Sequence, residues 1–206
     1  MSFYVTYGGD LTASNSLSDF FVSFSAFYAQ DGHEYVSSFN STTAFPGPLS
    51  GTEYAITSSL GEIEDFSFIA GAAASSELTY TLFDGAPSNW HILYGSLDSL
   101  EFGTSLVDWQ NTGTGNFDLG ETYLDITGLG LTGLLSDGQS NIVHEVVWGL
   151  MGGDATALEG VLNDILDDYG LSVNSSFADL ELAGLAGEVS TVGTAVAAES
   201  ELLLAA

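Results

Sequence analysis

The 206-residue sequence contains no lysine, no arginine and no cysteine, and only three prolines. Without Lys or Arg the chain has no cationic side chain for phosphate, which argues against a nucleic-acid binder and excludes a Walker lysine, a Schiff-base lysine and a polybasic membrane patch. Without Cys, disulfides, iron–sulfur clusters and thiolate zinc sites are excluded. No apolar run reaches the roughly 18 residues that a transmembrane helix needs.

The residues that are present indicate a folded, strongly acidic protein. There are 28 Asp and Glu against three His, giving a formal net charge of −28. Hydrophobic residues make up 45% of the chain and aromatic residues 12%, which is enough to build a core in a single domain. Because an ion pair between side chains would need a histidine, we expect stability to come mainly from apolar burial and hydrogen bonds.

The composition bears on localisation. The N-terminus has no basic region followed by a hydrophobic segment of signal-peptide length. A uniformly anionic, Gly- and Ser-rich, cysteine-free chain is typical of proteins that are exported unfolded through a one-step bacterial channel and carry a C-terminal signal. The Ala- and Gly-rich tail after Leu182, ending in ELLLAA, is either a frayed terminus or such a signal. We therefore predict a folded domain over residues 1–182 and a flexible tail over 183–206.

Periodicity predicts strands first and helices later. A helix is expected over 14–29, followed by a long loop over 30–50. Alternation and turn residues then predict an antiparallel meander with strands at 53–59, 66–71, 77–83, 91–97, 99–103 and 122–128. A helical stripe covers 141–151, a second helix capped by Asp154 runs to about Tyr169, and Ser175 or Ser176 caps a short last helix. This order predicts an α+β fold with one antiparallel sheet and helices on one face.

The predicted loop 30–50 contains His33 among apolar residues. A lone histidine in a loop is usually solvated, but Tyr35, Val36, Phe39 and Phe45 form an apolar set that a solvated loop does not need. An apolar loop of this length favours a second interpretation, a lid over a flat hydrophobic ligand.

Tyr80 and His91 flank a predicted hairpin. Tyr80 is either a β-favouring aromatic residue or a phenolate metal ligand with His91 behind it. The reference pKa of tyrosine lies near 10, so a neutral phenol is a poor ligand. A ferric ion together with a hydrogen bond from an imidazole would favour the phenolate.

The remaining polar candidates have weaker patterns. His144 lies on the flank of the helical stripe, one turn before Trp148, and the favoured interpretation is a packed helix residue with a backbone or water partner. Asp164 and Asp168 share a helix face, which is typical of a solvated surface rather than a glycosidase pair or a calcium site.

Five ordered stretches resemble one known family. They are GTEYAITSS (51–59), LTYTLF (78–83), LYGSLDSLEFG (93–103), VHEVVWGLMGGD (143–154) and ILDDYGLSVNSSF (165–177), and the closing ELLLAA is similar to that family's export signal. The family is that of the secreted bacterial haem-scavenging hemophores of the HasA type. The matches keep their order across most of residues 2–180.

The resemblance implies a non-enzymatic carrier of ferric haem b with a curved antiparallel sheet. It implies His33 and Tyr80 as axial iron ligands and His91 as the residue that hydrogen-bonds the tyrosine oxygen. Residues implied to pack on the haem are Tyr54, Leu82, Phe83, Leu93, Trp148 and Met151.

The resemblance also implies a biological setting. Such a protein leaves the cell through an ABC-type, type I secretion system, takes haem from host haemoproteins and delivers it to an outer-membrane receptor for iron acquisition. The alternative that composition leaves open is an acidic exported adhesin-like or calcium-stabilised interaction protein. A carboxylate-dependent hydrolase has less support, because no GxSxG motif or distinct carboxylate pair is present.

Overall fold

The computed structural model describes residues 2–27, 37–41, 49–58, 66–82 and 91–189. Nine strands, four α-helices and one 3-10 helix follow one another along these residues. Their order is β1 (Tyr4–Tyr7), α1 (Leu17–Phe27), β2 (Ser37–Phe39), β3 (Leu49–Gly51), β4 (Glu53–Thr57), β5 (Phe66–Ala72), β6 (Leu78–Thr81), β7 (Ile92–Val107), β8 (Asp118–Gly133), the 3-10 helix (Leu135–Ser140), α2 (Ile142–Met151), α3 (Thr156–Asp167), α4 (Phe177–Leu182) and β9 (Ala186–Glu188).

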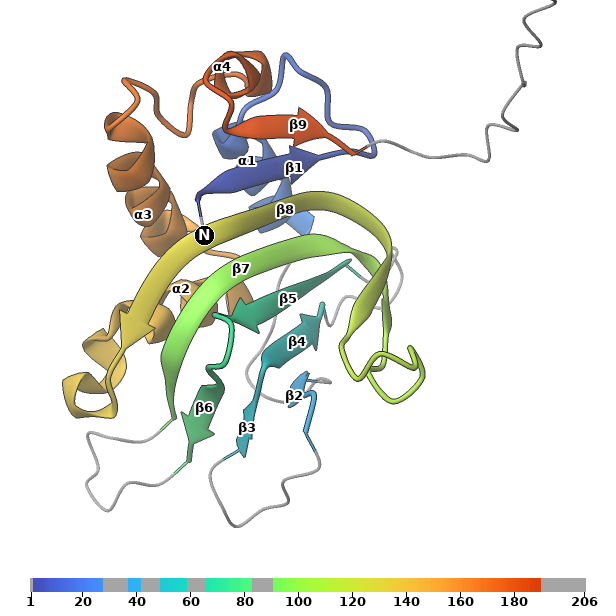
Figure 1. The fold of residues 1–206 in the computed structure, drawn as a ribbon, viewed down its shortest axis with the longest axis vertical. Coiled ribbons are helices and arrows are strands. Elements are labelled where there is room, and N and C mark those ends of the chain that lie inside the picture. Colours follow the sequence, from blue (N-terminus) through green and yellow to red (C-terminus); the bar gives the residue numbers. More distant parts are fainter. Residues whose placement is uncertain (1, 28–36, 42–48, 59–65, 83–90, 190–206) are drawn as a thin grey trace, which may run out of the picture.

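The strands form one sheet in the order β2-β4-β5-β7-β8-β1-β9, with β6 paired to β7 and β3 paired to β6 (Figure 1). All of these pairs are antiparallel except β1–β9, which is parallel. The predicted α+β class is therefore confirmed, and the expectation of a wholly antiparallel sheet is wrong only at its β9 edge. The loop expected over 30–50 contains the short strands β2 and the start of β3.

Two long strands give the sheet its curvature. β7 and β8 have 16 residues each and pair along most of their length. The register shifts between Leu97 and Ser99 and between Phe102 and Gly103, and such bulges bend a strand and increase its twist. The predicted strands 91–97 and 99–103 are therefore one strand interrupted by a bulge, and Figure 1 shows β7 and β8 as a strongly bent pair.

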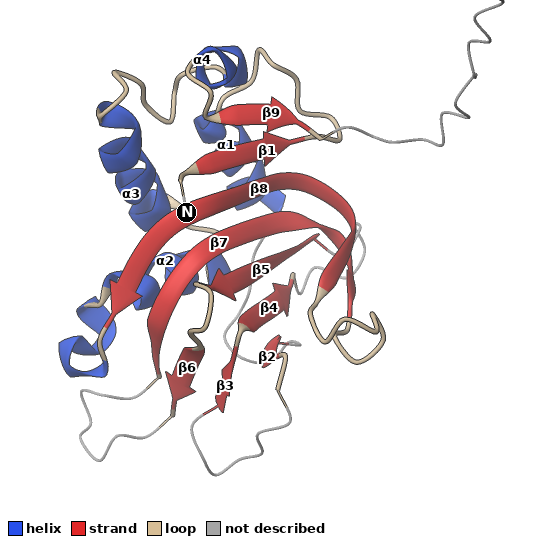
Figure 2. Cartoon of the chain, in the orientation of Figure 1, coloured by secondary structure: helices blue, strands red, loops and turns tan. Residues whose placement is uncertain are grey.

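The helices cover one face of this sheet, and the core lies between them. In Figure 2 the helices α1 and α2 lie behind the strands β7 and β8. Helix α1 supplies a cluster of phenylalanines that pack edge-on against Phe102 of β7. The largest fully buried side chains are Tyr7, Phe21, Phe24, Phe68, Phe102, Phe177, Leu17, Ile56, Leu78, Ile92 and Leu97.

Sequence signals located the helix ends well. Ser176 caps α4 through a capping box with Asp179, and it is one of the two serines predicted to cap this helix. The expected cap Asp154 lies one position too early, because Ala155 is the N-cap of α3, but the Asp154 side chain accepts a hydrogen bond from the backbone N–H of Thr156 at 2.9 Å. Gly170 follows α3 with φ +70°, a conformation that favours glycine at a helix end.

The N-terminal and C-terminal segments of the domain pack against each other. The rings of Tyr7 and Phe177 are stacked with centroids 4.3 Å apart. The Tyr7 hydroxyl donates to Glu181 at 2.7 Å, and the backbone N–H of Val5 donates to the carbonyl of Leu185 at 2.8 Å. Strand β9 lies beyond the expected boundary at residue 182, so the folded part extends at least to Glu188.

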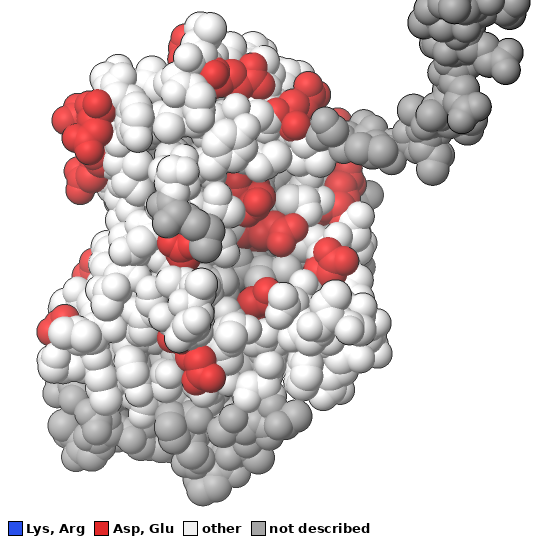
Figure 3. Space-filling view, viewed as in Figure 1, with Lys and Arg blue, Asp and Glu red and all other residues white. Residues whose placement is uncertain are grey.

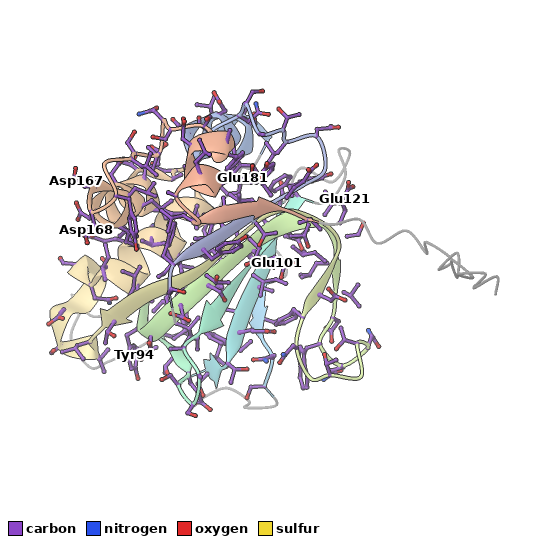
Figure 4. All side chains as sticks on the ribbon, turned by 45° about the horizontal axis from the view of Figure 1, so that its top comes forward. Tyr94, Glu101, Glu121, Asp167, Asp168 and Glu181 are labelled. Atoms are coloured by element: carbon purple, nitrogen blue, oxygen red, sulfur yellow. The ribbon has the colours of Figure 1, made fainter. Side chains whose placement is uncertain are left out.

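The opposite face of the sheet carries acidic side chains. Figure 3 shows Asp and Glu gathered over this face, and Figure 4 labels Glu101 and Glu121 on it. Glu101 on β7 is the register partner of Asp125 on β8. Burial and the charge of Glu101 raise the pKa of Asp125 to about 6.

No helix of the described residues is long and apolar enough to cross a membrane.

Candidate functional site

Tyr80 and His91 form the central contact of the site. The Tyr80 hydroxyl lies 2.6 Å from Nδ1 of His91, a short hydrogen bond, and the two rings meet edge to face with centroids 6.0 Å apart. Both side chains are partly buried. The structure thus brings together the two residues that the sequence analysis paired.

Strand pairing explains this contact. Tyr80 on β6 is the register partner of Leu93 on β7, so residue 91 lies next to Tyr80 just before β7 begins. His91 has φ +58°, in the left-handed region that non-glycine residues adopt rarely. Such a backbone conformation is costly and is maintained only where surrounding contacts fix it.

Beside this pair lies a small, open, mostly apolar cavity. Its walls come from β4, β6, β7 and α2. The lining residues are Tyr54, Tyr80, Leu93, His144, Val147, Trp148 and Met151. Trp148 lines the cavity and is 45% exposed although it is a large aromatic residue.

One wall of the cavity is held by contacts between β4 and α2. The Tyr54 hydroxyl lies 3.7 Å from the sulfur of Met151, and the Tyr54 ring packs against Phe39 of β2 with centroids 5.0 Å apart. Tyr54, Phe39 and Met151 are all buried. This wall is therefore built from side chains that are already fixed by packing.

The opposite wall is tied to β7 by two side chains near the start of α2. Asn141 Nδ2 donates to the Leu93 carbonyl at 3.1 Å, and the Leu93 N–H donates to His144 Nδ1 at 3.2 Å. Asn141 also caps α2 by accepting from the His144 N–H. His144 therefore has the backbone partner that was expected of a packed helix histidine, and its ring also stacks on Trp148, 5.4 Å between centroids.

Burial shapes the titration of the site. Burial raises the pKa of Tyr80, with a smaller contribution from Tyr54, so the phenol is neutral at ordinary pH unless a cation stabilises the phenolate. Burial lowers the pKa of His144, and the neighbouring His91 lowers it further. The cavity thus contains neutral polar groups on an apolar wall.

The structure places the predicted site residues in different positions relative to the cavity. Five of the predicted contact residues line the cavity, namely Tyr54, Tyr80, Leu93, Trp148 and Met151. His91 joins them through its bond to Tyr80. Leu82 is partly buried just after β6 and outside this lining, and His33 and Phe83 lie outside the described residues.

Sequence reasoning missed two residues of the lining in this role. Val147 was expected only as part of the apolar stripe of its helix, and His144 only as a packed histidine. The signal that could have found them is helical spacing, because 147 and 148 lie three and four residues after 144, and 151 lies three residues after 148, so all four share a face.

Metal ions such as calcium are usually held by several carboxylate or histidine side chains that lie close together. In the part of the chain that the structure describes, no three His, Asp or Glu side chains lie close enough together to hold a metal ion. The calcium-stabilised alternative gains no site from those residues.

Comparison with known proteins gives consistent results. The family described as heme-binding protein A (HasA) matches residues 1–206. The chain is 39% identical over 189 residues to the hemophore HasA of Serratia marcescens, which covers 91% of this chain and 94% of that protein.

Solved structures of hemophores share the fold. The holo and apo forms of the hemophore HasA from Yersinia pestis each match with a TM-score of 0.66 at 24% identity, covering 91% of this chain and 98% of theirs. Hemophores are carriers and not enzymes, so the expected non-enzymatic role is confirmed. The whole-length family match and the 39% identity together show that this chain belongs to the HasA family of hemophores.

Proposed function

We propose that this protein captures ferric haem b as an extracellular hemophore, with Tyr80 as an axial ligand of the iron. The observation that carries the proposal is the 2.6 Å contact between Tyr80 and His91 beside an apolar cavity. A phenol with a basic nitrogen at its oxygen and an exposed indole alongside is a suitable arrangement for a flat, metal-containing ligand.

The chemistry of the pair supports this role. Because burial raises the pKa of Tyr80, the phenol would lose its proton to a base only when a strong Lewis acid such as Fe(III) binds its oxygen. His91 is placed to take part in that proton transfer and afterwards to donate a hydrogen bond to the iron-bound oxygen. An anionic oxygen ligand stabilises Fe(III) relative to Fe(II), so captured haem would stay oxidised.

The cavity supplies the remaining affinity. The porphyrin would pack on Tyr54, Leu93, Trp148 and Met151, with Leu82 and Phe83 assigned by the family resemblance. Burying apolar surface stabilises a complex by about 2.5 kcal/mol per 100 Å² before ordering costs. The chain offers no Lys or Arg to the ligand, so apolar contact and iron coordination must provide most of the binding free energy.

The second axial ligand is proposed to be His33. This assignment rests on the family resemblance, because residue 33 lies outside the described residues. Phe39, a few residues further on, packs against Tyr54 in the wall of the cavity. The described chain therefore lies beside the site six positions after residue 33.

A hemin titration tests the proposal. We expect a saturable one-to-one Soret shift, which Tyr80→Phe alters in position and weakens in affinity. Tyr169→Phe is the matched control, because Tyr169 is 54% exposed at the end of α3, away from the cavity lining. If the unmodified protein shows no saturable shift, or Tyr80→Phe leaves the spectrum unchanged, the proposal is wrong.

Export and delivery complete the proposed function. We propose that the tail carries the signal for an ABC-type exporter, that host haemoproteins supply the haem and that an outer-membrane receptor receives it. The family membership and the anionic composition support this setting. Expression with and without residues 190–206 beside a type I exporter tests the signal: the full chain should reach the medium and the shortened chain should remain in the cells.

A further inference from the structure

His144 is a buried histidine whose proton position is fixed by its backbone partner. The side chain is only 5% exposed. Its Nδ1 lies 3.2 Å from the backbone nitrogen of Leu93. A backbone N–H can only donate, so Nδ1 must be the unprotonated, accepting nitrogen. In the neutral ring the proton is therefore on Nε2.

That Nε2–H has no acceptor among the described residues. The structure gives His144 a ring stack on Trp148, the Leu93 bond at Nδ1 and the backbone cap from Asn141, and none of these uses Nε2. Buried donors are nearly always satisfied, and one that is not calls for a ligand or a water. Since His144 lines the cavity beside Tyr80, the donor belongs to the site.

The neighbouring polar groups are already occupied. The Asn141 amide donates to the carbonyls of Leu93 and Gly138 and accepts from the His144 N–H. Tyr80 and His91 bond to each other. His144 thus has a buried ring donor that none of its contacts in the described residues uses, and its lowered pKa keeps that ring neutral.

From this arrangement we propose that His144 Nε2–H donates a hydrogen bond to a carboxylate at the edge of the bound porphyrin. The inference rests on the proposed haem binding. It makes His144 a specificity residue, which distinguishes porphyrins that carry free carboxylates from those that do not. Because this chain contains no lysine or arginine, a neutral, oriented imidazole would supply the hydrogen bond to the carboxylate.

Hemin and hemin dimethyl ester distinguish this proposal, because the ester keeps the iron and the apolar faces but loses both carboxylates. A hydrogen bond to a charged group corresponds to about a tenfold to a hundredfold change in affinity. We expect the unmodified protein to prefer hemin over the diester by about that factor. His144→Phe should abolish the preference, and His144→Gln, which keeps an N–H donor, should retain part of it.

Asn141→Ala provides the matched control. It removes the hydrogen bond from the Asn141 side chain to the Leu93 carbonyl and keeps the Nε2–H donor of His144. We expect it to weaken hemin and diester binding by the same factor, so that the preference is unchanged. A preference that survives in His144→Phe would overturn the inference and leave haem binding itself intact. Failure of the unmodified protein to bind either compound would instead overturn the proposed function.

The proton position can be measured without any ligand. Long-range ¹H–¹⁵N NMR correlations of the imidazole ring in the haem-free protein should show Nε2 of His144 protonated and Nδ1 unprotonated. His144→Phe identifies the signals by their loss. A protonated Nδ1 would contradict the backbone bond on which the inference depends.

Discussion

The Tyr80 hydroxyl and His91 Nδ1 lie 2.6 Å apart, although eleven positions separate the two residues along the chain. Pairing of β6 with β7 carries His91 to Tyr80, and the unusual backbone angle of His91 accompanies this placement. A residue held in such a conformation beside a phenol is typical of a functional site. The contact therefore leads to the first prediction.

His91→Ala should weaken hemin binding by about 10- to 100-fold, the usual cost of removing a hydrogen-bond partner from a metal ligand. The Tyr80 oxygen would lose the nitrogen that takes part in its deprotonation, while the apolar walls would remain. Competition with apomyoglobin measures the change in affinity, and circular dichroism checks the fold. Equal affinity of the variant and the unmodified protein would show that His91 does not support the ligand.

Stability should depend on pH through Asp125. Its pKa is raised from 3.8 to about 6, so the folded state binds this proton more tightly than the unfolded state does. The stability that the protonated carboxyl provides is full below about pH 4, decreases as the pH rises and is lost above about pH 6. Allowing for partial exposure, we expect a difference of about 1–2 kcal/mol.

Urea unfolding at pH 5 and pH 7.5 measures this difference. Asp125→Asn should remove most of it and should stabilise the protein at pH 7.5, because it eliminates the cost of burying the charged carboxylate and the repulsion with Glu101. Asp118→Asn removes an exposed carboxylate from the same strand and controls for the change in net charge. The same pH dependence in both variants would assign the effect to other groups.

The contact between Tyr7 and Phe177 should contribute to stability. Phe177 is fully buried and stacks on Tyr7, so Phe177→Ala leaves a cavity and should lower the free energy of unfolding by about 3–5 kcal/mol. Leu182→Ala lies on the same helix but changes a side chain that is 87% exposed, and it should have little effect. Thermal and urea unfolding compare the two; a loss below about 1 kcal/mol in Phe177→Ala would contradict the packing described.

Two glycines should respond in opposite directions to alanine. Gly95 on β7 has φ +125°, and a Cβ there would lie 2.3 Å from the backbone oxygen of Glu77. Gly95→Ala should therefore disturb the pairing of β6 with β7 and destabilise the protein by more than about 2 kcal/mol. Gly160 lies within α3 with open space around it, and Gly160→Ala should stabilise by about 0.5–1 kcal/mol. Because Tyr80 lies on β6, only Gly95→Ala should also weaken hemin binding.

Local signals predicted the helices and most strands, whereas tertiary pairing determined what they missed. Ser176, Asp154 and Gly170 mark helix ends through their own side chains or backbone freedom, so the sequence is sufficient there. The bulge after Leu97 breaks the alternation of β7 without ending the strand. β9 has three residues of no particular strand preference and exists because it pairs with β1.

The candidate site also combines features that the sequence predicts with features that depend on tertiary pairing. The family resemblance pointed to Tyr80 and His91, but only the register of β6 and β7 shows that their atoms meet. His144 was expected to be an ordinary packed residue, and its backbone bond agrees. Its unused Nε2–H depends on which atom faces Leu93, and no spacing rule contains that information.

The parallel pairing of β1 with β9 also bears on when the molecule can finish folding. Residues 4–7 are synthesised long before residues 186–188, the strand that completes their edge. Until these later residues have been synthesised, β1 lacks β9 and Tyr7 lacks Phe177. Contacts of such long sequence separation form slowly. The nascent domain therefore remains incompletely folded until β9 is available to pair with β1.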